Sequence, residues 1–196
     1  MAKGNVRGRN GRRMVGLAFV GLVALALAAC SSNPSSTPGG TTGAAPSSTT
    51  STPPSTISPA DSARQEATAA YAGMWQQMVK ASETADWQSP ELAKYATGDA
   101  LGVINRSLYT DHLNGVVSKG APTTNPQVTK ADPTNGPTTV MISDCGDDSH
   151  WVKYKKDGSP FTDSPGGRRS ITAEVKKQAD GSWRVTRFAV EGVGSC

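Results

Sequence analysis

Apolar residues follow three different patterns along this chain. Residues 14–29 form an uncharged, mostly apolar run, whereas residues 31–58 contain almost no large apolar side chain. From residue 59 onwards, apolar positions recur first at helical and then at alternating spacing. These patterns predict a leader of residues 1–29, a connecting segment of residues 30–58 and a folded domain of residues 59–196.

The domain begins with a signal for a long helix. Ser58 is a favourable capping residue, Pro59 suits the first helical position, and Asp61 complements the helix dipole. The apolar residues that follow recur at intervals of three and four, which predicts one buried stripe. The stripe consists of Ala67, Ala70, Tyr71, Met74, Trp75, Met78 and Val79.

Two shorter helices are expected next. The Ser-Pro-Glu sequence at 89–91 repeats the start signal and predicts a short helix through about Tyr95. A third helix should end before Gly115, since glycine commonly follows a helix C-terminus. Its buried stripe is expected to comprise Leu101, Ile104, Leu108 and His112.

Strand signals begin after Gly120. The β-branched and alternating segments are separated by turn sequences, including Asn-Gly at 135–136 and Asp-Gly at 180–181. The predicted strands are 127–131, 138–144, 151–154, 170–175 and 183–190. Helices first and antiparallel strands afterwards predict an α+β domain.

This order of elements resembles the nuclear transport factor 2-like fold. The segment Asp180-Gly181-Ser182-Trp183-Arg184-Val185 looks like the Asp-Gly-x-Trp-x-Val hairpin common in its last two strands. The resemblance implies a cone-shaped domain, in which N-terminal helices are followed by a curved antiparallel sheet. Ketosteroid isomerases and polyketide cyclase-like proteins share that fold.

The N-terminus has the parts of an export signal. Its first thirteen residues contain five basic side chains and no acid, and the apolar run ends in Leu27-Ala28-Ala29-Cys30. This tetrapeptide resembles the lipobox of bacterial lipoproteins, whose cysteine is alkylated with diacylglycerol before cleavage. We expect a lipid on Cys30 to anchor the chain on the extracytoplasmic face of the cell membrane. The 16-residue run is shorter than the roughly 20 residues of a membrane-spanning helix, which argues against a permanent anchor helix.

The segment after Cys30 has the composition of a tether. Ser, Thr, Pro, Gly and Ala make up 26 of the 28 residues from 31 to 58. So little apolar surface cannot offset the entropy of ordering, which predicts disorder. The combination of lipobox, tether and domain resembles small lipoproteins of Gram-positive actinomycetes.

Loss of the leader removes the basic character of the chain. Five of the 20 basic residues precede Cys30 but none of the 16 acidic ones does, so the mature chain has a formal charge of −1. The sequence pI near 9.1 therefore does not indicate a nucleic-acid partner. Lys153, Lys155 and Lys156 are expected to form the solvated face of a strand.

Two cysteines remain in the exported domain. Cys145 and Cys196 are expected to form a disulfide, because export favours disulfides and no Cys-x-x-Cys redox motif is present. The bridge would fasten the C-terminus to the strand that ends at Cys145.

The sequence contains no metal-binding spacing. His112 and His150 are the only histidines, and they form no recognised pair. Asp144, Asp147, Asp148 and His150 cluster around Cys145, but they lack the alternation of a calcium loop. We therefore expect a solvated turn, and no metal or other cofactor.

Catalysis in the isomerase-like relatives depends on an Asp, His or Tyr inside the cone, where burial raises a carboxylate's pKa. The candidates here are Tyr95, Asp99, Asp111 and His112. Asp99 also suits a helix cap, and His112 also suits a partly buried structural histidine. None matches a catalytic motif of the family, so no catalytic residue is predicted.

These observations favour a non-enzymatic surface lipoprotein. Its domain would bind a small ligand in the cone or an envelope protein on the open sheet face. The alternatives are an extracytoplasmic isomerase or cyclase-type enzyme and a structural accessory subunit of an envelope complex. A carboxylate converging on an apolar cone would favour the enzyme. A cone filled by Trp75, Met78 and Phe188, with an exposed apolar sheet face, would favour partner binding.

Overall fold

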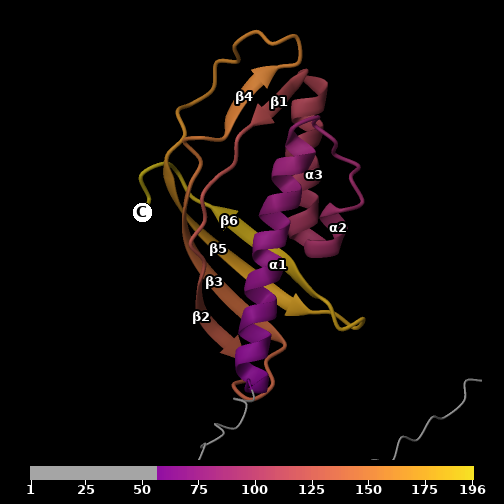
Figure 1. Ribbon diagram of the computed structural model, residues 1–196, viewed down its shortest axis with the longest axis vertical. Coiled ribbons are helices and arrows are strands. Elements are labelled where there is room, and N and C mark those ends of the chain that lie inside the picture. Colours follow the sequence, from indigo (N-terminus) through magenta and orange to yellow (C-terminus); the bar gives the residue numbers. More distant parts are fainter. Residues whose placement is uncertain (1–56) are drawn as a thin grey trace, which may run out of the picture. The chain divides into compact units, whose positions relative to one another are not determined.

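Three helices precede six strands in residues 57–196, the part of the chain that the computed structural model describes. The helices cover one face of an antiparallel sheet (Figure 1), which confirms the α+β prediction. The leader, Cys30 and the tether through residue 56 lie outside the described residues. The helices are α1 (Pro59–Ser82), α2 (Leu92–Tyr95) and α3 (Gly98–Leu113).

The first helix, α1, begins where the sequence predicted. The Ser58 side chain caps it by accepting a hydrogen bond from the amide of Asp61 at 3.1 Å. The predicted stripe is buried except at Val79, which is half-buried. A single apolar stripe of this kind holds a long helix against a sheet.

The two shorter helices differ slightly from their predictions. Tyr95 at the end of α2 lies directly on α1, where a Cβ on Gly73 would come within 2.4 Å of its ring. Glycine at position 73 therefore allows the two helices to approach closely. The N-cap of α3 is Thr97, and Asp99 lies in the first turn rather than at the cap.

Four of the strands form a sheet in the order β2-β3-β5-β6, and β1 pairs with β4 in a second, two-stranded sheet. The short strand β1 was not predicted, and β3 continues three residues beyond its predicted end. The strands are β1 (Val116–Lys119), β2 (Gln127–Asp132), β3 (Thr139–Asp147), β4 (Val152–Lys155), β5 (Arg168–Lys177) and β6 (Trp183–Val190).

Irregular pairing bends the larger sheet. The β2–β3 register shifts between Val128 and Lys130, and the β5–β6 register shifts between Glu174 and Val175. An extra residue in one strand bends that strand and increases its twist. The inner face of the curved sheet packs against α1 and α3 (Figure 1).

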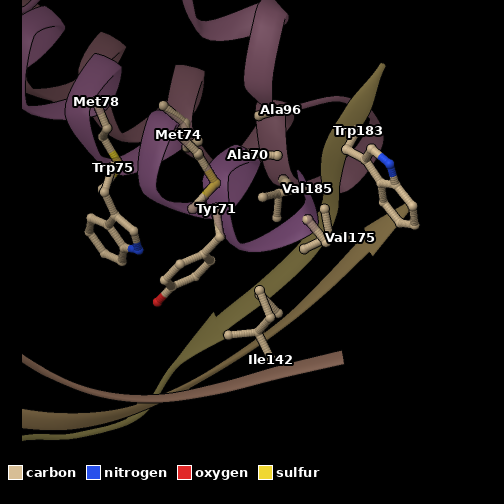
Figure 2. Close-up of a cluster of buried hydrophobic side chains, with 14 of the residues drawn as sticks. Ala70, Tyr71, Met74, Trp75, Met78, Ala96, Ile142, Val175, Trp183 and Val185 are labelled. Atoms are coloured by element: carbon tan, nitrogen blue, oxygen red, sulfur yellow. The ribbon is translucent and has the colours of Figure 1, made fainter. Parts of the chain in front are cut away.

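The hydrophobic core lies between α1 and this inner face. In Figure 2, Tyr71 and Met74 of α1 point toward Ile142, Val175 and Val185 of the strands. The buried cluster is built entirely from residues between 63 and 185, so the domain carries a complete core of its own. None of the described helices has both the length and the apolarity needed to cross a bilayer.

The outer face of the sheet is polar along β5 and β6. It presents side chains such as Thr172, Glu174 and Lys176 on β5 and Arg184 on β6. The apolar sheet face that would favour a docked partner is therefore not found on these two strands.

A disulfide joins Cys145 of β3 to Cys196, as the sequence predicted. Hydrogen bonds from Gly194 N to the Arg168 carbonyl and from Ser170 N to Ser195 Oγ hold the same tail. The C-terminus is thereby fixed beside the start of β5.

Candidate ligand-binding site

A cleft of about 230 Å³ opens between α1, α3 and the sheet. Its wall is mostly apolar, because the last residues of the α1 stripe meet the start of β5 and the end of β6 there. The apolar residues that line it are Trp75, Met78, Val103, Ile104, Pro122, Trp151, Ile171, Phe188 and Val190. Trp75, Met78 and Phe188 thus line an open cleft rather than filling a closed cone.

Trp75 is the centre of an aromatic cluster in this wall. Its ring centroid lies 6.2 Å from that of Trp151 and 6.1 Å from that of Phe188, with the planes nearly perpendicular. Edge-to-face pairs of this kind are favourable and hold each ring in one orientation. Trp151 is fixed further because its Nε1 donates to Ser82 Oγ at 3.3 Å. The aromatic wall is therefore largely pre-formed.

The cleft continues into a more polar compartment of about 190 Å³. The two compartments share several residues, including Ile104, Ser107 and Trp151. Along α3, Val103, Ser107 and Asp111 lie at intervals of four, on one face of the helix. This face changes from apolar to hydroxyl to carboxylate along the cleft.

An ion pair closes one side of the polar compartment. Lys153 Nζ of β4 donates to Asp111 Oδ1 of α3 at 2.8 Å, and the Asp111 side chain is only 14% exposed. The expectation that Lys153 belongs to a solvated strand face was wrong, because β1–β4 pairing turns that side chain toward α3. Asp111, a candidate catalytic acid, is engaged by this lysine.

A second ion pair lies where the two compartments meet. Arg169 Nε donates to Asp148 Oδ2 at 2.9 Å, and the amide of Gly167 donates to Asp148 Oδ1 at 2.7 Å. Asp148 thereby holds the start of β5 against the segment that follows β3. Both carboxylate oxygens are occupied.

The acids around Cys145 do not form the solvated turn that the sequence suggested. Asp144 lies within β3 and is 4% exposed, because that strand continues through Asp147. Asp147 accepts a hydrogen bond from the amide of Ser149, and hydrogen bonds from this serine lower the pKa of Asp147. His150 is exposed. Within residues 57–196, no three His, Cys, Asp or Glu side chains are grouped to hold a metal ion.

The buried carboxylate of Asp144 is paired with a tyrosine. Tyr71 Oη donates to Asp144 Oδ2 at 2.9 Å, and the amide of Asn125 donates to Oδ1 at 2.8 Å. Burial raises the pKa of Tyr71, and the negative charge of Asp144 raises it further. Both residues lie below the cleft and do not line it.

The remaining candidates do not line the cleft, although Asp99 lines an adjoining hollow of about 360 Å³ that shares Val103 and Phe188 with it. Tyr95 packs on α1, and Asp99 is exposed in the first turn of α3. The expectation that His112 is partly buried was wrong. His112 is exposed, as is the neighbouring Leu113, which is 66% exposed, because β4 reaches the last turn of α3 on the Asp111 side.

Sequence reasoning missed most of the polar cleft residues. The spacing of Val103, Ser107 and Asp111 could have indicated a shared helix face. Ser118 could not be found, because its strand β1 is short and precedes the first recognised turn. Arg169 gave no local signal either, since its partner Asp148 lies in another segment.

Comparison with known proteins finds no matching family model and no matching curated protein. Among solved structures, a ketosteroid isomerase-like protein from Erwinia carotovora atroseptica is 12% identical, with a TM-score of 0.42, over 64% of this chain and 92% of that one. Aln2 from a Streptomyces species is 14% identical, with a TM-score of 0.43, over 69% and 93%. The intermembrane space region of chloroplast protein ARC6 is 14% identical, with a TM-score of 0.37, over 64% and 94%. At these identities and TM-scores the matches support no inference about function. The functional inference is therefore based on the cleft itself.

Proposed function

We propose that this chain is an exported lipoprotein whose domain binds a small, largely apolar ligand in the cleft between α1, α3 and the sheet. The observation that carries the proposal is the pre-formed aromatic wall of Trp75, Trp151 and Phe188. Concave sites with apolar and aromatic walls and a few polar groups are the usual form of small-ligand sites.

The charged groups of the cleft support binding rather than turnover. Asp111 is held by Lys153, and both oxygens of Asp148 are engaged by Arg169 and Gly167. Asp148 therefore has no oxygen without a partner, and Asp111 has one oxygen, Oδ1, already held by the lysine. A general base needs a free position within hydrogen-bond reach of its substrate.

The export part of the proposal is supported by the basic leader, the apolar run and Leu27-Ala28-Ala29-Cys30. A lipid at Cys30 and a tether of residues 31–58 would hold the domain near the extracytoplasmic face of the membrane. The polar outer face of β5 and β6 supports a ligand in the cleft over a partner on the sheet.

The ligand proposal is tested by titrating the purified domain, residues 57–196, with N-phenyl-1-naphthylamine, an uncharged probe whose fluorescence rises in apolar surroundings. Saturable binding is expected. Phe188→Ala should weaken it several-fold, because it removes part of the aromatic wall. Phe161→Ala is the matched control, since Phe161 does not line the cleft. No saturable binding, or equal binding by a folded Phe188→Ala variant, would contradict the proposal.

A further inference from the structure

The disulfide between Cys145 and Cys196 has a positive charge beside one of its two sulfur atoms. The guanidinium of Arg168, on β5, donates from Nε and Nη2 to Cys145 Sγ at 3.3 and 3.1 Å. In the β3–β5 register Cys145 is opposite Ser170, so Arg168 lies two residues along the neighbouring strand and on the same face of the sheet. Among residues 57–196, no basic side chain donates to Cys196 Sγ in this way.

Arg168 directs its charge at sulfur rather than at a carboxylate. Asp147 is opposite Arg168 in the strand register. Hydrogen bonds from Ser149 lower the pKa of Asp147, and the charge of Arg168 contributes less. Within the described part of the chain Arg168 forms no ion pair, and two of its nitrogens contact Cys145 Sγ instead. A positive charge beside a cysteine favours its thiolate, so Cys145 is the better leaving group of the two cysteines.

The two sulfur atoms also differ in their surroundings. Cys145 is half-buried within β3 and is paired with β5. Cys196 is exposed, as are all the residues from 191 onwards, and it belongs to no helix or strand. Thiol–disulfide exchange depends on access to the attacked sulfur and on the pKa of the leaving thiol, which leaves faster when its pKa is lower. Both conditions favour the same reaction, attack at Cys196 with departure of Cys145.

We propose that Cys196 is a modification site, at which the disulfide exchanges with a low-molecular-weight thiol. The thiolate of that molecule attacks Cys196 Sγ, a new disulfide bond forms between these two sulfur atoms, and the bond to Cys145 breaks. The electron pair of the broken bond leaves on Cys145 as a thiolate beside Arg168. One disulfide is lost and one is gained, so the step needs no oxidant or reductant besides the thiol itself.

The test treats the folded, disulfide-bonded domain, residues 57–196, with 2-mercaptoethanol and quenches samples with excess N-ethylmaleimide. Peptide mass spectrometry is expected to find mercaptoethanol on Cys196 and the maleimide on Cys145 in most singly exchanged molecules. The exchange rate should stay nearly constant in urea below the unfolding transition, because the folded protein is the species attacked.

Variants of Arg168 test the role of its charge. Arg168→Gln should slow the exchange by about threefold to tenfold, because Cys145 becomes a poorer leaving group. It should also raise the share of product that is modified at Cys145. Arg168→Lys keeps the charge and should retain most of the rate. Arg106→Gln removes an exposed arginine on α3 and should change neither the rate nor the product.

Four outcomes would overturn the inference. They are the absence of exchange in the folded domain, modification mainly at Cys145, a rate that rises with urea as the unfolded fraction does, and a folded Arg168→Gln variant with the natural rate and product. None of them bears on ligand binding in the cleft, because the inference does not depend on the proposed function.

Discussion

Tyr71 on α1 and Asp144 on β3 are 73 residues apart and share a buried hydrogen bond of 2.9 Å. The second oxygen of Asp144 accepts from the amide of Asn125. The carboxylate therefore links the long helix, the central sheet and the segment before β2. A buried polar group with all its partners in place holds elements in one arrangement, and it becomes costly when a partner is lost.

Tyr71→Phe should lower the free energy of unfolding by about 1 to 3 kcal/mol, because Asp144 stays buried while one of its hydrogen bonds is lost. Urea denaturation of residues 57–196 measures the change. Tyr109→Phe is the matched control, since Tyr109 is 44% exposed and should lose little. Equal stability of the two variants would show that the Tyr71 hydroxyl contributes nothing.

The same tyrosine makes stability depend on alkaline pH. Burial raises the pKa of Tyr71 above its ordinary value near 10, so the folded state holds the proton more tightly than the unfolded state. The stabilisation that Tyr71 gains from this difference in pKa is complete below pH 10 and is lost as the pH rises above it. The urea midpoint of the natural domain should fall more steeply above pH 10 than that of Tyr71→Phe. Parallel curves would contradict this assignment.

Glu174 should affect stability in acid. Hydrogen bonds from Thr186, Arg187 and Lys176 lower its pKa from 4.5 to about 2. A lowered pKa in the folded state gives stability that is present above pH 4.5 and lost as the pH falls toward 2. Glu174→Gln should flatten the acid dependence in this window, whereas Glu83→Gln, at an exposed position, should not. An unchanged slope for Glu174→Gln would refute the prediction.

Removing the disulfide should destabilise the domain. Cys145 and Cys196 are 51 residues apart, and closing a loop of that size contributes on the order of 4 kcal/mol in the chain-entropy model. The Cys145→Ser, Cys196→Ser double variant should therefore unfold at lower urea. Mass spectrometry of non-reduced protein from cells should show the two peptides joined. Recovery of both thiols free would remove the basis for this prediction.

Cys30→Ala should abolish lipid labelling and release the chain from membranes or leave it uncleaved. Stable membrane attachment needs more than one acyl chain, which a lipidated N-terminal cysteine provides and an alanine cannot. Labelled palmitate and membrane fractionation measure the effect, and the Cys145→Ser, Cys196→Ser double variant controls for loss of the other two cysteines. Normal palmitate incorporation by Cys30→Ala would refute the lipobox interpretation.

Local signals were sufficient for most of the elements. The capping serine and helical stripe predicted α1, and the Asp-Gly turn predicted the hairpin of β5 and β6, because these structures depend on residues close in sequence. The error at His112 arose because helical spacing continues to the end of α3, whereas the packing that would bury it does not.

The sequence by itself determined the order of the elements other than β1, the α+β class and the pairing of Cys145 with Cys196. Only the tertiary structure decided that Asp144 is buried against Tyr71 and that Ser107 and Ser118 meet Trp151 in one cleft. Helix stripes, turns and caps are set by neighbours within a few residues along the chain. The cleft combines side chains from α1, α3, β1, β4, β5 and β6. Their proximity depends on sheet pairing and helix packing, for which no spacing along the chain is a sufficient signal.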